Sequence, residues 1–191
     1  DQLEKLYLSC SPESALKKSL ARGLEPCYAL APSFRNGEPA DLEHNPEFLM
    51  LEWYRSNSDY HQIMQDCQEL IQFVSDKIQD KPVITYQGKK LDLSNHWPIF
   101  SIAELFEQAT HHKLSQVLEL DQMRQLAIEL GYKTVDSNWE QLFNQIVMNL
   151  VEPQLPPAPC FLKDFPAKIS PLCQLDPNQP HLAQRFELYI A

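Results

Sequence analysis

Two apolar, aromatic segments on either side of a short polar loop constrain the fold of this chain most strongly. The first segment, residues 26–35, reads PCYALAPSFR, and the second, residues 46–55, reads PEFLMLEWYR. The residues between them, 36–45, are polar and include a glycine and a proline, which favour turns. Two strand-like segments joined by such a loop predict an antiparallel pair of strands.

The clearest helix is expected over residues 59–78. Apolar side chains recur there at steps of three and four residues, and the opposite face is polar. The apolar set is Tyr60, Ile63, Met64, Cys67, Leu70, Ile71, Val74 and Ile78. The pattern predicts a surface helix that packs this face against a larger body.

A shorter helix is expected before the strand pair. Ser11 can cap it, Pro12 suits its first position and Gly23 can end it. Residues 5–10 in front of it are interpreted as a short strand.

The rest of the chain predicts a helical insertion followed by another strand. Residues 59–150 are expected to be largely helical, with a small hairpin near 82–93. A proline-rich connector at 152–160 ends this region, and residues 183–191 alternate like a strand. Strands at both ends of the chain with helices between them predict an α+β fold with a mainly antiparallel sheet.

Composition narrows the classes of function. The chain has 191 residues, of which 43% are hydrophobic, enough for a real core in one large domain or part of one. A net charge of −10 argues against a chain whose main work is coating nucleic acid. Only 4 residues are glycine, which disfavours a glycine-rich phosphate loop.

The sequence contains no apolar run of membrane-spanning length and no segment shaped like a signal peptide, so we expect a cytoplasmic protein without a membrane partner. The five cysteines are odd in number and widely spaced, which favours reduced thiols over a disulfide framework or a zinc site. His111 and His112 have no acid or cysteine at matching spacing, so no metal ligand is predicted.

Three motifs within residues 33–54 point to a family: SFRN, HNPEF and MLEWY. Their arrangement as strand, charged loop and strand resembles motif 2 of the class II aminoacyl-tRNA synthetases. Within that class they resemble lysyl-tRNA synthetases and the related ligases that attach (R)-β-lysine to a lysine of elongation factor P. TYQGKKLDL, PAKISPL and QRFELYI are similar to the same branch. The resemblance covers nearly the whole chain and implies an antiparallel sheet flanked by helices.

The two branches differ in the acceptor of the activated amino acid. SPES at 11–14, PCYALAPSFRN and EWYR are closer to the β-lysine ligases, whereas PAKISPL leans toward the synthetases. We therefore expect an ATP-dependent ligase that activates (R)-β-lysine or lysine as an adenylate and transfers it to elongation factor P. The alternatives are a lysyl-tRNA synthetase catalytic fragment that charges tRNA(Lys) and a non-catalytic paralogue.

The resemblance implies an ATP site. Arg35 would hold the α-phosphate and stabilise charge during adenylation, which suits a planar, permanently charged guanidinium. Glu38 matches, across a one-residue insertion, the acid that contacts the adenine amino group. His44 would approach the outer phosphates, Asn45 the adenine edge, and Phe48 would stack on adenine. By residue type alone, a solvated strand-end arginine would be the preferred interpretation of Arg35, and a core side chain nearly as good an interpretation of Phe48 as a stacking ring.

Alternation along the second strand indicates an amine site beside the adenine platform. It places Phe48, Met50, Glu52 and Tyr54 on one face, whereas Glu47 points the other way. An acid beside a phenol makes a poor core but a good pocket for an ammonium group.

A lysine-like substrate carries two ammonium groups and needs at least two acceptor sites. Ser11 and Glu13, from the Ser-Pro-Glu turn, together with Glu52 and Tyr54 could provide them. These four are the expected substrate-binding residues.

The resemblance also implies parts that the 191 residues do not contain. Motif 3, with a second arginine and the magnesium-binding acids, is expected beyond Ala191, and the motif 1 dimer elements before residue 1. We therefore expect a class II catalytic domain that is incomplete at both ends. Its cofactors would be ATP and Mg²⁺, and its assembly a homodimer.

Overall fold

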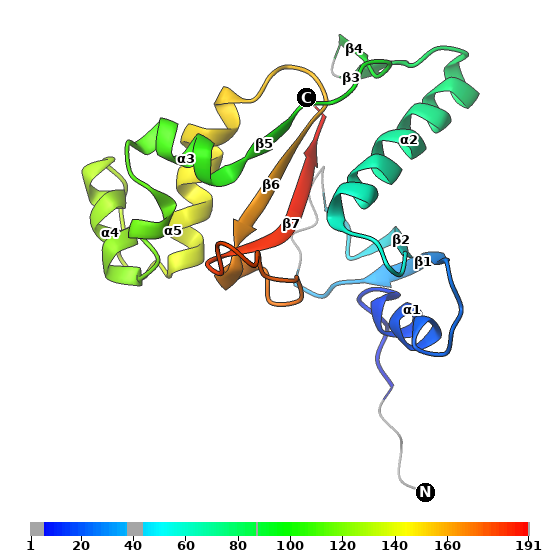
Figure 1. Cartoon of the computed structure of the whole chain (residues 1–191), viewed down its shortest axis with the longest axis horizontal. Helices are drawn as coiled ribbons and strands as arrows, with labels where there is room; N and C mark the ends of the chain where they lie inside the picture. The colour runs from blue at the N-terminus through cyan, green and yellow to red at the C-terminus, as the bar shows by residue number, and fades with distance from the viewer. Residues whose placement is uncertain (1–5, 38–43, 87, 191) are drawn as a thin grey trace, which may run out of the picture. The chain divides into compact units, whose positions relative to one another are not determined.

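The computed structural model describes residues 6–37, 44–86 and 88–190, and the chain divides into two compact units (Figure 1). The first unit comprises residues 1–58 and the second residues 59–191. The elements of the first unit are α1 (Glu13–Leu20), β1 (Cys27–Phe34) and β2 (Glu47–Tyr54). All residues expected to bind substrate or nucleotide therefore belong to the first unit.

Helix α1 begins one residue later than the sequence predicts, with Pro12 rather than Ser11 at the cap position. The Ser11 hydroxyl still accepts a hydrogen bond from the backbone N–H of Glu13 at 3.3 Å. The helix ends at Leu20, and Gly23 lies in the following turn with φ +84°. Glycine adopts that left-handed conformation without a steric penalty.

Strands β1 and β2 form the predicted antiparallel pair, with Cys27 opposite Tyr54 and Phe34 opposite Glu47. The strand expected at residues 5–10 was wrong over its described part, 6–10. The backbone N–H of Phe34 donates to the Ser9 carbonyl at 2.9 Å, but the segment does not continue into a ladder of such bonds.

The second unit has the predicted helical content between strands. Its elements in chain order are α2 (Tyr60–Gln79), β3 (Val83–Tyr86), β4 (Lys89–Asp92), β5 (Ile99–Ser101), α3 (Ile102–Thr110), α4 (Leu120–Glu129), α5 (Trp139–Ile146), β6 (Cys160–Pro166) and β7 (Leu182–Tyr189). Short 3-10 turns lie at Leu114–Gln116, Glu152–Gln154 and Ala167–Ile169, and a π-helical turn at Val147–Val151. The antiparallel hairpin β3–β4 falls within residues 82–93.

Helix α2 starts at a reciprocal cap. The Asp59 carboxylate accepts hydrogen bonds from the backbone N–H groups of His61 at 2.9 Å and Gln62 at 3.1 Å. The Gln62 side chain accepts the backbone N–H of Asp59 at 3.1 Å. Both bonds satisfy donors that have no partner inside the helix, so the boundary is set locally.

The buried face of α2 is narrower than predicted. Met64 is buried, and Cys67 and Ile71 pack beside it against a cluster that includes Trp97 and Phe161. Tyr60 also packs against this cluster and Ile63 is half-buried, whereas Leu70, Val74 and Ile78 are exposed. The mean direction of these three exposed residues around the helix axis differs from that of Met64, Cys67 and Ile71 by only about 50°, at about 100° per residue. The cluster below α2 therefore covers only part of a continuous apolar stripe.

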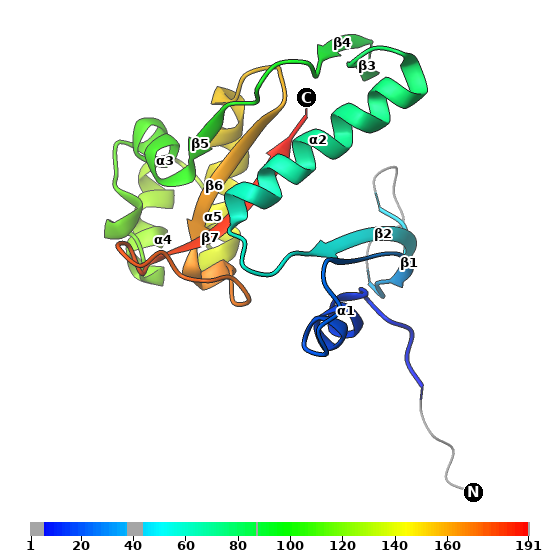
Figure 2. The same cartoon turned by 45° about the vertical axis from the view of Figure 1, so that its right-hand side comes forward.

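Strands β5, β6 and β7 form a sheet in that order, with helices on both faces. β6 pairs antiparallel with β7, whereas β5 pairs parallel with β6, which the sequence did not predict. The chain between β5 and β6 contains α3, α4 and α5, the kind of crossover that parallel strands require. Leu162 packs with these helices on one face of the sheet. Its chain neighbour Phe161 points to the other face and packs with α2. Figure 1 and Figure 2 show the two helical layers on either side of the sheet.

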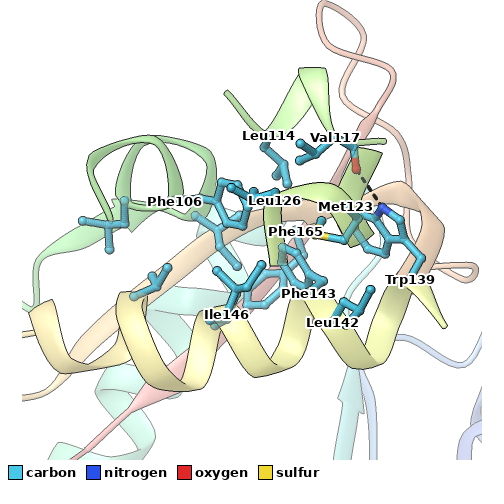
Figure 3. Packing of buried hydrophobic residues seen from close by; sticks show 14 of the residues in the cluster. Phe106, Leu114, Val117, Met123, Leu126, Trp139, Leu142, Phe143, Ile146 and Phe165 are labelled. Atoms are coloured by element: carbon cyan, nitrogen blue, oxygen red, sulfur yellow. Dashed lines mark hydrogen bonds between the residues drawn. The ribbon is translucent and has the colours of Figure 1, made fainter. Parts of the chain in front are cut away.

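The main core of the second unit lies between α3, α4 and α5 and contains a stack of aromatic rings among aliphatic side chains (Figure 3). Phe143 stacks against Trp139, with ring centroids 5.1 Å apart, and against Phe106 at 6.1 Å. The indole N–H of Trp139 donates to the Val117 carbonyl at 2.8 Å, so its polar atom is satisfied in the core. Trp97 is also buried, so both tryptophans are packing residues.

Candidate functional site

The hairpin β1–β2 has one covered face and one exposed face. Phe48, Met50, Glu52 and Tyr54 share the covered face with the residues opposite them on β1, which are Ser33, Ala31, Ala29 and Cys27. Helix α1 packs against both strands, and its Leu16 is buried. On the opposite face Tyr28, Leu30 and Leu49 are exposed. The predicted alternation is confirmed, and it leaves Glu47 on the exposed side.

The end of the covered face that the sequence predicts to bind an amine, called the amine end, is built around Tyr54. Its hydroxyl donates to a Glu52 carboxylate oxygen at 2.6 Å. Burial and this bond raise the pKa of Tyr54, and the negative charges of Glu52 and Glu13 raise it further. Tyr54 is therefore a neutral phenol at physiological pH, held among carboxylates that can accept an ammonium group.

Helix α1 brings Glu13 to this end. Glu13 is the first residue of the helix, where a negative charge is favourable, and its field reaches Tyr54. Its carboxylate forms an ion pair with Lys17, one helical turn later. The negative charge of Glu13 thus acts on Tyr54, while the Ser11 hydroxyl is engaged at the start of the helix.

The other end of the face carries the predicted nucleotide residues. Arg35 directly follows β1, and its backbone N–H donates to the Pro46 carbonyl at 2.9 Å. Its guanidinium carbon lies 5.3 Å from the centroid of the Phe48 ring. Phe48 and Glu52 are four residues apart on one strand, about 13 Å at the usual rise per residue. A ligand that spans both ends must have roughly that length.

The remaining predicted nucleotide residues belong to the loop. His44 and Asn45 are exposed and precede β2. Glu38 lies outside the described residues. The expected contacts of these three residues with adenine and phosphates stay predictions.

Sequence reasoning missed two residues of the candidate site, one on β1 and one on α1. Ser33 is fully buried opposite Phe48, and its hydroxyl has no hydrogen-bond partner in the described structure. Alternation applied to β1 as well as β2 would have placed it there. Lys17 follows Glu13 by four residues, the spacing of helical ion pairs, and this spacing is readable from the sequence.

Within residues 6–37, 44–86 and 88–190, no group of three or more histidine, cysteine, aspartate or glutamate side chains could hold a metal ion. His112 contacts the Thr110 carbonyl at 2.9 Å and lies 3.7 Å from Glu129. The helices of the described part include none with the length and apolarity to cross a membrane.

Residues 1–191 all match the family of class II tRNA synthetases (D, K and N). The chain belongs to this family. This class II synthetase chain is 37% identical over 187 residues to a lysine–tRNA ligase of Carboxydothermus hydrogenoformans. The match covers 97% of the chain and 38% of that relative. It is 35% identical to the lysine–tRNA ligase of Moorella thermoacetica, covering 97% of the chain and 38% of the relative. It is 32% identical to the lysine–tRNA ligase of Staphylococcus aureus strain MW2, covering 97% of the chain and 37% of the relative. This class II chain thus spans less than two fifths of these relatives.

Proposed function

We propose that the chain is part of a lysyl-tRNA ligase, which activates lysine with ATP and transfers the lysyl group to tRNA(Lys). The observation that carries the proposal is the covered face of β1–β2. It holds the hydrogen-bonded pair Glu52 and Tyr54 at one end, and Arg35 in contact with Phe48 at the other. The relatives named as lysine–tRNA ligases support the same reaction. They favour the tRNA ligase alternative over transfer to elongation factor P, which they do not support.

The chemistry requires positioning and charge neutralisation. A carboxylate oxygen of lysine attacks the α-phosphorus of ATP, the new P–O bond forms, and pyrophosphate leaves with the electron pair of the broken bond. Arg35 would neutralise charge that develops on the α-phosphate oxygens, and Phe48 would hold the base by stacking. Glu52 and Tyr54 would hold an ammonium group of lysine, with Glu13 as a further carboxylate.

Magnesium is the expected companion of ATP, but the described residues hold no cluster that fits it. We therefore assign no step to the metal. The residue types at the Arg35 end suit a nucleotide, because a cation and an aromatic ring are in contact there.

The test uses the full-length protein that contains these residues. We expect ATP–pyrophosphate exchange that depends on lysine, and transfer of labelled lysine to tRNA(Lys). Transfer to elongation factor P with no charging of tRNA would replace the proposal by the protein-modifying reaction. Absence of exchange with both lysine and (R)-β-lysine would instead indicate a non-catalytic paralogue.

A further inference from the structure

The amine end of the covered face already contains an ammonium group that belongs to the chain. Lys17 and Glu13 lie on α1 four residues apart, and their side chains form an ion pair. The Lys17 side chain is 46% exposed and that of Glu13 32%, so the pair faces solvent in part. An incoming ligand can therefore reach the Glu13 carboxylate while Lys17 swings into water.

The ion pair determines how many carboxylates at this end are available to a substrate. Glu13 and Glu52 carry one negative charge each and Lys17 carries one positive charge, while Tyr54 supplies a neutral hydroxyl. While Lys17 is paired with Glu13, only the Glu52 carboxylate is free to pair with an ammonium group of the substrate. If Lys17 leaves Glu13, each carboxylate can pair with one of the two ammonium groups of lysine.

We propose that Lys17 is a specificity-determining residue of this site, whose ammonium group occupies Glu13 until an ammonium group of the substrate displaces it. This inference rests on the proposed function, since it takes the substrate to be a diamino acid. Ligands without a suitably placed positive charge cannot replace Lys17 at Glu13, so the ion pair selects against them. The cost of selection is weaker binding of lysine itself.

The pair is suited to exchange because of its residue types and exposure. Lysine carries a compact charge on a flexible four-carbon chain, unlike the rigid fork of arginine. Partly exposed i,i+4 pairs contribute little free energy, so a substrate ammonium can compete with one at a cost of about two- to fivefold in affinity. A buried bidentate pair would not exchange in this way.

The test compares three variants of the full-length protein in lysine-dependent ATP–pyrophosphate exchange. Lys17→Gln removes the competitor, Lys17→Arg keeps its charge, and Lys18→Gln removes the same charge from the next position of α1. We expect Lys17→Gln to lower the KM for lysine about two- to fivefold, with the KM for ATP unchanged. Lys17→Arg should stay at or above the wild-type KM for lysine, and Lys18→Gln should match the wild type.

Salt separates this role from a purely structural one. The difference between wild type and Lys17→Gln should shrink as ionic strength rises, because the competing charges become screened. The thermal unfolding midpoint of each variant shows that all of them fold.

The failures are distinguishable. If the wild type is active and Lys17→Gln has an unchanged or higher KM for lysine, the inference on Lys17 is wrong and the proposed function stands. An equal decrease in Lys18→Gln also overturns it, because the effect would then be a general one of helix charge. A wild type without lysine-dependent exchange overturns the proposed function, and the role of Lys17 with it.

Discussion

The guanidinium of Arg35 lies over the ring of Phe48, with its central carbon 5.3 Å from the ring centroid. This cation–π contact connects the end of β1 with the start of β2, and it joins two residues that are predicted to bind ATP. A base that stacks on this side of Phe48 needs the space that the guanidinium occupies. If Phe48 stacks on a base as we propose, Arg35 would have to leave the ring and would then be free to contact the phosphates.

Replacing Arg35 with alanine should reduce ATP–pyrophosphate exchange by about a hundredfold or more, the usual effect of removing a charge stabiliser from a transition state. The measurement is the exchange rate of the full-length protein at saturating lysine. Arg22→Ala, in the turn after α1, is the matched control and should retain wild-type exchange. Exchange that survived Arg35→Ala would show that the site assignment is wrong.

Replacing Phe48 with leucine should raise the KM for ATP about tenfold, because a leucine side chain loses aromatic stacking with the base but keeps much of the volume. The KM for lysine should change little, since Phe48 lies at the far end of the strand from Glu52. Leu49→Ala provides the control, because Leu49 is 67% exposed on the opposite face of β2. Equal effects of both substitutions on the KM for ATP would contradict a stacking role.

Replacing Tyr54 with phenylalanine removes the hydroxyl that donates to Glu52. In the proposed site the same hydroxyl also helps to hold an ammonium group of lysine. A hydrogen bond to a charged group is worth about 1.5–3 kcal/mol, so its loss should raise the KM for lysine by about tenfold or more. Tyr28→Phe changes the same group on the exposed face, where Tyr28 is 75% exposed, and should have no such effect. An unchanged KM for lysine in Tyr54→Phe would show that the Tyr54 hydroxyl does not help to bind lysine.

The same residue predicts a dependence of stability on pH. Because burial, Glu52 and Glu13 raise the pKa of Tyr54 in the folded protein, the fold holds this proton more tightly than the unfolded chain does. Its stabilising contribution is complete below the ordinary tyrosine pKa of 10.0 and is lost as pH rises above it. Urea unfolding of wild type and Tyr54→Phe between about pH 9 and pH 11 should show a steeper loss of stability in the wild type. Parallel curves would contradict the raised pKa.

Local signals predicted the elements that form the candidate site. Alternation placed Glu52 and Tyr54 on one face of β2, and the structure adds the 2.6 Å bond between them. The role of each residue toward ATP or lysine stays a prediction, because family membership describes the chain as a whole. The Ser33 hydroxyl could not be predicted as unpaired, since that depends on every neighbour that covers it.

Pairing between distant segments was beyond local signals. Strand β5 lies parallel to β6 although three helices separate them in the chain, and only tertiary packing selects that partner. Periodicity identified the apolar residues of α2 but could not tell which row would be covered. Met64 and Ile71 contact the core, whereas Val74 and Ile78 stay exposed, because the extent of the surface below the helix decides which apolar residues are covered.

Replacing Phe143 with alanine should destabilise the second unit by about 3–5 kcal/mol, the range for deleting a buried aromatic ring. Phe143 is buried and lies between the rings of Trp139 and Phe106, so the loss leaves a cavity that two rigid side chains cannot close (Figure 3). The check is urea unfolding followed by tryptophan fluorescence. Met148→Ala, at an exposed position just after α5, should cost much less. A loss below about 1 kcal/mol in Phe143→Ala would contradict the packing described here.

Cys67 should react with iodoacetamide far more slowly than Cys10 at neutral pH. Burial raises the pKa of the Cys67 thiol to about 11, with a smaller contribution from the charge of Asp66, whereas Cys10 is exposed. Because the thiolate is the reactive form, the alkylation rate of Cys67 should rise about tenfold per pH unit up to about pH 10 without levelling off. Mass spectrometry of timed alkylation reports each thiol separately, and Cys67→Ser identifies the correct peptide. Urea-unfolded protein is the matched reference, in which Cys67 should level off near the ordinary thiol pKa of about 8.5. A plateau below pH 9 in the folded protein would mean that α2 does not bury this side chain.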